Sequence, residues 1–144
     1  MAAVAYEKVY GEECNVISFV IPIEPRTKKN NNQILRNRRT GKPFVASSKE
    51  FAEYQDNCRA FMPVLDKPID YPVNVKAVYY MHTRHKVDIT NLHNALHDIL
   101  VHYGVLADDN MKIVVSTDGS RVKYDKQHPR TEVTILGSSE RFED

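Results

Sequence analysis

The segment from His82 to Ile113, HTRHKVDITNLHNALHDILVHYGVLADDNMKI, decides the fold because it holds the clearest helix in the chain. Its apolar residues recur at helical spacing between Ile89 and Tyr103 and form one stripe: Leu92, Leu96, Ile99 and Tyr103. Gly104 follows where a left-handed residue commonly ends a helix. The sequence therefore predicts a helix over 89–103 with an acidic group at each end.

The two acidic groups are Asp88, before the helix, and the neighbours Asp108 and Asp109, after it. Taken alone, Asp88 is typical of an N-cap, whose carboxylate accepts backbone N–H groups. The pair alone is typical of a turn. In an extended chain its two side chains would face opposite ways, so only one of them is expected to lead in any site.

Working outward, the sequence predicts several strands and one further helix. Val73–Met81 alternates apolar and polar residues, and Asn15–Ile23 is rich in β-branched residues. Met111–Thr117 and Arg130–Leu136 are predicted as later strands joined through a turn at Asp118–Gly119. A capping box at Ser47–Glu50 predicts the start of a helix that buries Phe51, Tyr54, Cys58 and Phe61 and ends at Pro63.

This order of elements predicts an α/β (α+β) fold, a mixed sheet flanked by two main helices. A chain of 144 residues, 42% hydrophobic and 27% charged, suits one domain over 1–144, with 1–14 and 138–144 frayed. Cys14 and Cys58 show no zinc spacing, and two free thiols are favoured over one bridge. No export signal or membrane-length apolar run is seen, so a cytoplasmic location is expected.

Positive charge is concentrated in one segment although the net charge is only +1. Between Arg26 and Lys42 there is no acidic residue, and the cations are Arg26, Lys28, Lys29, Arg36, Arg38, Arg39 and Lys42. An Asn run and Thr40–Gly41 favour a loop or a hairpin here. A basic arm suits contact with phosphates, and a solvated, mobile loop is the alternative.

The segment from Asp88 to Ile113 resembles the signature of the RusA family of Holliday junction resolvases. That signature runs Asp-x-Asp-Asn-Leu, a lysine, Asp-Ala-Leu, a glycine and an Asp-Asp pair before a strand. The matching residues here are Asp88, Asn91-Leu92, Asp98, Gly104 and Asp108-Asp109. The opening strand with its proline, Lys28-Lys29-Asn30 and Pro129-Arg130 extend the similarity over most of the chain.

The resemblance implies a homodimer that cuts branched DNA, a four-way junction, by paired nicks with Mg²⁺, or Mn²⁺ in its place. It implies Asp88, Asp109 and Asp108 as metal ligands, with Asp109 leading its pair and Asp98 in support. We expect DNA contacts from Lys28, Lys29, Arg36, Arg38, Arg39, Lys42, Arg84 and Lys86.

Two residues depart from the signature. Thr90 replaces its second aspartate and brings an oxygen without charge, and Asn94 replaces its helix lysine and cannot neutralise a phosphate. Lys86 or Arg84 would have to supply the lost positive charge. The alternatives are a branched-DNA binding protein that no longer cuts, or a nuclease that acts on other structured DNA or RNA.

Two other patterns favour structural roles. His93 and His97 lie one helical turn apart and could seat zinc, but Asn94 follows His93 where a zinc protease has glutamate, so a histidine-rich polar face is favoured. Tyrosines could stack on unpaired bases, but packing in the core is favoured for all but one of Tyr79, Tyr80, Tyr103 and Tyr124.

Overall fold

The computed structural model describes residues 16–28, 33–46 and 49–140. Its main sheet runs in the order β1 (Val16–Ile21), β7 (Arg130–Gly137), β4 (Val73–Met81) and β5 (Val114–Ser116), and β6 (Arg121–Tyr124) also pairs with β4. β7 is antiparallel to β1 and β4, whereas β5 and β6 are parallel to β4. The sheet is therefore mixed, as the sequence predicts.

β5 and β6 lie along the same edge of β4. β5 pairs at Val73 and Asn74, and β6 pairs farther along, from Val78 to Met81. The turn between them is fixed by the Asn74 side-chain oxygen, which accepts hydrogen bonds from Ser116 Oγ at 2.6 Å and from the Asp118 amide at 2.7 Å. The Asp118–Gly119 turn therefore joins β5 to β6 and does not lead directly to the last strand.

The prediction of a strand over Met111–Thr117 is wrong for its first half, because β5 begins only at Val114. Asn110 turns the chain instead. Its backbone carbonyl accepts hydrogen bonds from the amides of Ile113 and Val114, and its side chain accepts one from the Lys112 amide. Residues 111–113 are thus held in a local asparagine turn before the strand begins.

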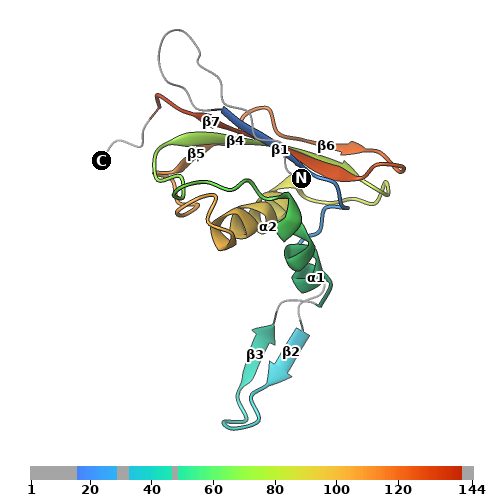
Figure 1. Cartoon of the computed structure of the whole chain (residues 1–144). Helices are drawn as coiled ribbons and strands as arrows, with labels where there is room; N and C mark the ends of the chain where they lie inside the picture. The colour runs from blue at the N-terminus through green and yellow to red at the C-terminus, as the bar shows by residue number, and fades with distance from the viewer. Residues whose placement is uncertain (1–15, 29–32, 47–48, 141–144) are drawn as a thin grey trace.

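Two helices cover one face of the sheet, α1 (Lys49–Cys58), followed by the short η2 (Arg59–Phe61), and α2 (Ile89–His102) (Figure 1). The predicted stripes are confirmed for Phe51, Tyr54 and Cys58 of α1 and for Leu92, Leu96 and Ile99 of α2, which are buried. Phe61 and Tyr103, the last residue of each predicted stripe, lie beyond the two α-helices and are only half-buried. Val73, Val75, Ala77 and Tyr79 of β4 are buried in the same core. Each fully buried aliphatic side chain contributes roughly 1.5–3 kcal/mol, which fixes the faces of both helices.

The basic segment forms a hairpin of β2 (Gln33–Arg36) and β3 (Pro43–Ala46), which projects away from the sheet and helices (Figure 1). The Asn37 side chain accepts hydrogen bonds from the amides of Arg39 and Thr40, and Gly41 takes the left-handed conformation at φ +70°. Of the two predicted possibilities, loop or hairpin, the described residues form the hairpin.

Several expectations fall partly outside the described residues. Ser47, Cys14, Lys29, the first fourteen residues and residues 141–144 lie there. Ser138, expected to be frayed, donates its amide to the Pro72 carbonyl at 2.9 Å. Cys58 carries a free thiol whose burial raises its pKa to about 11. No helix in the described part of the chain is long and apolar enough to cross a membrane.

Candidate active site

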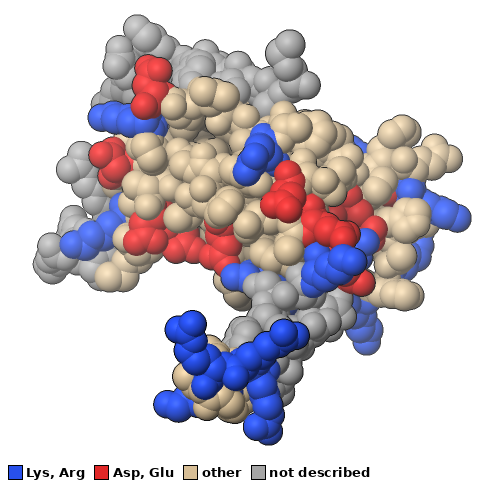
Figure 2. All heavy atoms as spheres, turned by 60° about the horizontal axis from the view of Figure 1, so that its bottom comes forward, with Lys and Arg blue, Asp and Glu red and all other residues tan. Residues whose placement is uncertain are grey.

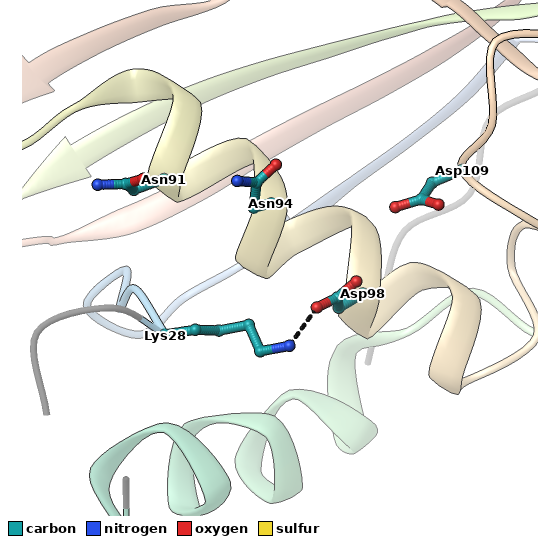
Figure 3. A pocket seen from close by; sticks show the side chains of 5 residues that line it. All are labelled: Lys28, Asn91, Asn94, Asp98 and Asp109. Carbon is teal, nitrogen blue, oxygen red and sulfur yellow. Dashed lines mark hydrogen bonds and ion pairs between the residues drawn. The ribbon is translucent and has the colours of Figure 1, made fainter. Parts of the chain in front are cut away.

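One face of α2 is polar and faces a pocket. Asn91, Asn94 and Asp98 lie three and four residues apart, so they share this face, while Leu92 and Ile99 point into the core. Figure 3 shows the three polar side chains along the helix. The amphipathic pattern that buries one side of α2 therefore presents two side-chain amides and one carboxylate on its opposite side.

The chain after α2 turns back beside this polar face. Gly104 takes φ +73°, a conformation that costs a residue with a Cβ about 1–2 kcal/mol. The next residues are held by Ile69, whose amide donates to the Val105 carbonyl at 2.9 Å and whose carbonyl accepts from the Ala107 amide at 2.8 Å. Val105 and Leu106 are buried, so the start of the loop that carries Asp109 is anchored in the core.

Five residues line the pocket that results, which has a volume of about 340 Å³: Lys28, Asn91, Asn94, Asp98 and Asp109. They come from three separate segments, the chain after β1, helix α2 and the loop after α2 (Figure 3). Lys28 Nζ contacts Asp98 Oδ2 at 2.5 Å. The Asp109 carboxylate points toward the helix from the opposite side.

Asp108 and Asp109 have different surroundings, as the sequence predicts for neighbours. Asp108 accepts hydrogen bonds from the Asn110 side chain and the Asp109 amide, and both lower the pKa of its carboxyl. Partial desolvation raises the pKa of Asp109, and the adjacent carboxyl groups of Asp108 and Asp98 raise it further. Of the two, only Asp109 lines the pocket.

Asp88 occupies the N-cap position of α2, but its side chain makes no capping hydrogen bond. The Asp88 carboxylate therefore does not cap the helix, as it would if its role were only structural. Asp88 lines a neighbouring hollow with Thr90, and Asn91 lines both this hollow and the Asp109 pocket. The structure thus brings Asp98 and Asp109 together and leaves Asp88 in the adjoining hollow.

The donor atoms of the pocket suit a hard divalent cation. Carboxylate and amide oxygens are the protein ligands that Mg²⁺ prefers. Desolvation is the main cause of the raised pKa of Asp109, and a cation would offset it together with the smaller repulsion from Asp98 and Asp108. The match concerns the type of donor only. Within residues 16–28, 33–46 and 49–140, no three side chains of His, Cys, Asp or Glu are grouped as a ready-made metal site.

Comparison with known families gives the same assignment as the motif. Residues 22–136 match the family model described as Endodeoxyribonuclease RusA. The chain belongs to the RusA family. It is therefore an endodeoxyribonuclease of the type that resolves Holliday junctions. The match includes all five pocket residues and the basic hairpin. No curated protein sequence gives a significant match to the chain.

The cations expected to contact DNA are dispersed over the surface of this RusA nuclease. Arg36, Arg38, Arg39 and Lys42 are exposed on the hairpin, and Figure 2 shows blue groups gathered at its end. Arg84 lies over the ring of Tyr124 at 4.1 Å from its centroid, and Lys86 lines a different pocket. Neither Arg84 nor Lys86 lines the Asp109 pocket, where the expected compensating charge is needed.

Sequence reasoning gave Lys28 only a general DNA-contacting role and missed its place in the pocket. The only signal available was the Lys28-Lys29-Asn30 match to the family, because Lys28 and Asp98 are 70 residues apart. The prediction that His93 and His97 lie on a polar face is wrong, because His97 is buried and His93 is half-buried against the sheet. Their rings stack 5.5 Å apart, and Tyr79 Oη lies 2.6 Å from His93 Nδ1. Neither histidine lines the pocket.

Proposed function

We propose that this RusA-family nuclease hydrolyses phosphodiesters of four-way DNA junctions at the pocket beside α2, with Mg²⁺ as the physiological cofactor and Mn²⁺ as a substitute. The observation that carries the proposal is the approach of Asp109 to the polar face of α2. Two segments that are separate in sequence supply oxygen donors to one open pocket, which a phosphate can enter from solvent.

We assign the roles of the acidic residues from their contacts. In this proposal Asp109 holds the cation from the pocket and Asp88 holds it from the adjoining hollow, which shares Asn91 with the pocket. Asp98 supports the pocket from α2, and Asp108 shapes the loop through its bonds to Asn110 and Asp109. When bound, the cation supplies charge for activating water and for stabilising the leaving oxygen.

The basic hairpin holds the DNA backbone in this proposal. Its exposed cations neutralise phosphates, and its projection from the body allows it to reach a duplex arm beside the pocket. We further propose a symmetric homodimer, because a two-fold axis would present two pockets to two equivalent strands of a junction. Sedimentation should then give about twice the 16.6 kDa of one chain.

Cleavage of a synthetic four-way junction tests the proposal. We expect paired nicks with Mg²⁺ or Mn²⁺, no nicks with EDTA, and little cutting of a linear duplex of the same arm sequence. Junction binding without nicks in either metal would contradict the proposal and indicate a binding protein in which Thr90 and Asn94 have cost the activity. Equal cutting of a flap substrate would instead indicate broader structure selectivity.

A further inference from the structure

Lys28 is the only cation among the five described residues that line the Asp109 pocket. Its ammonium lies between both helices, because Nζ contacts Asp98 of α2 and also lies 5.6 Å from the ring centroid of Phe51 of α1. Figure 3 shows its side chain entering the pocket from the chain that follows β1. The position of this charge is therefore set by contacts to two elements.

A phosphate that enters the pocket needs such a charge. Its other lining residues are two carboxylates and two neutral amides, so without Lys28 the protein side chains would repel an anion. An ammonium carries three N–H donors, and the contact with Asp98 uses one of them. Two donors remain for phosphate oxygens.

We propose that Lys28 contacts the phosphate to be cleaved, and that Asp98 is a positioning residue that holds the lysine in the pocket. This inference rests on the proposed function of the pocket. It changes the role of Asp98, which serves Lys28 in this account and does not hold the metal. It also explains how Asn94 can be neutral, since the positive charge enters from a different segment.

A purely structural ion pair is the competing explanation. The side chains of Lys28 and Asp98 are 39% and 42% exposed, and pairs with this exposure contribute little to stability. Removing the charge of Lys28 should then change cleavage or DNA binding much more than it changes the melting temperature. A stability measurement must therefore accompany every functional one.

The test uses Lys28→Met, which keeps the stem over Phe51 and removes the charge. Lys28→Arg is the conservative variant. Asn94→Lys in the Lys28→Met background returns a charge to the pocket from one helical turn before Asp98. Lys76→Met is the matched control, because Lys76 is exposed on the sheet face opposite the helices.

We expect Lys28→Met to lower kcat on a junction with Mg²⁺ by roughly 100-fold, as for loss of one charge-stabilising donor. Lys28→Arg and the Asn94→Lys second-site variant each place a positive charge in the pocket, so each should regain at least about tenfold of this roughly 100-fold loss. Lys76→Met should cut like the parent. A Lys28→Met protein that melts normally and cuts within a few-fold of the parent would overturn the inference. The inference would also be overturned if both Lys28→Arg and the Asn94→Lys second-site variant cut as slowly as Lys28→Met.

A second measurement separates this inference from the proposed function. In EDTA, the slope of log affinity for the junction against log salt should fall by roughly 0.9 in Lys28→Met, the change expected for one lost phosphate contact. Asn94→Lys should restore it. If the parent never cuts, the proposed function fails, while an unchanged salt slope independently overturns the assignment of Lys28.

Discussion

The carboxyl groups of Asp108 and Asp109 have pKa values shifted in opposite directions although the residues are neighbours. Asp108 accepts two hydrogen bonds within its own loop, which favour its ionised form. Asp109 has lost part of its solvent and lies near other carboxyl groups, which disfavours ionisation. One residue step along the backbone thus separates a loop-shaping aspartate from a candidate metal ligand.

Asp88→Asn should abolish junction cutting while leaving junction affinity within about two- to three-fold of the parent. The substitution removes a charge proposed to hold the cation, but it leaves the exposed position and the helix N-terminus intact, since asparagine is also a good N-cap residue. Cleavage and gel-shift assays on the same junction check this. If Asp88→Asn cuts as fast as the parent, Asp88 does not hold the metal.

His93 and His97 should make stability depend on pH. Burial lowers the pKa of both rings, and for His97 the nearby Asp98 offsets part of this effect. Below the unfolded pKa of about 6.5 the unfolded state binds protons more readily, so the free energy of unfolding falls as pH drops. His97 also has a buried Nε2 without a hydrogen-bond partner among the described residues.

Urea denaturation at pH 7.5 and 5.5 measures this dependence. The parent should lose stability at the lower pH, and His97→Gln should lose less because the penalty for protonating one buried ring is gone. His102→Gln, at an exposed position on the same helix, should behave like the parent. An identical loss in His97→Gln and the parent would show that burial of this ring does not set the pH dependence.

At the scale of elements, our proposal assigns DNA binding to the hairpin of β2 and β3 and no part in the chemistry. Arg38→Ala with Arg39→Ala should weaken junction binding and lower the salt slope by roughly 1 to 2, because each cation that contacts a phosphate releases about one counterion. At saturating protein the cleavage rate should stay near that of the parent. A reduced rate at saturation with unchanged affinity would contradict the assignment of the hairpin to DNA binding.

The helices could be predicted from sequence because their signals are local. Apolar spacing located the buried faces of α1 and α2, and Gly104 marked the end of α2. β5 and β6 could not be placed, since they share one edge of β4 only through pairing with residues about 40 positions away. Asn110 also delays the start of β5 to Val114, through hydrogen bonds that composition does not reveal.

The site was predictable in composition but not in arrangement. The family motif indicated Asp88, Asp98 and Asp109, and extended-chain geometry favoured one member of the Asp108–Asp109 pair. Neither the motif nor this geometry could indicate that Asp98 would contact Lys28, because that contact depends on how the chain after β1 lies against both helices. The place of Lys28 in the pocket follows from tertiary packing alone.

For the whole molecule, positive charge is concentrated at one place, the hairpin, although the net charge is +1. Figure 2 shows basic groups gathered at the end of the hairpin, whereas the body carries acidic groups with basic groups among them. In our proposal the hairpin attracts the DNA, the pocket receives a phosphate beside Lys28, and the bound cation is needed to cut it. Binding and cutting should consequently respond differently to salt and to chelators.

The most direct test of the central claim compares Asp109→Asn with the parent and with Asp108→Asn on a four-way junction in Mg²⁺. The account predicts paired nicks by the parent, cutting by Asp108→Asn reduced by no more than about tenfold, and a loss of at least about 100-fold in Asp109→Asn with binding retained. Equal cutting by Asp109→Asn and the parent would contradict it.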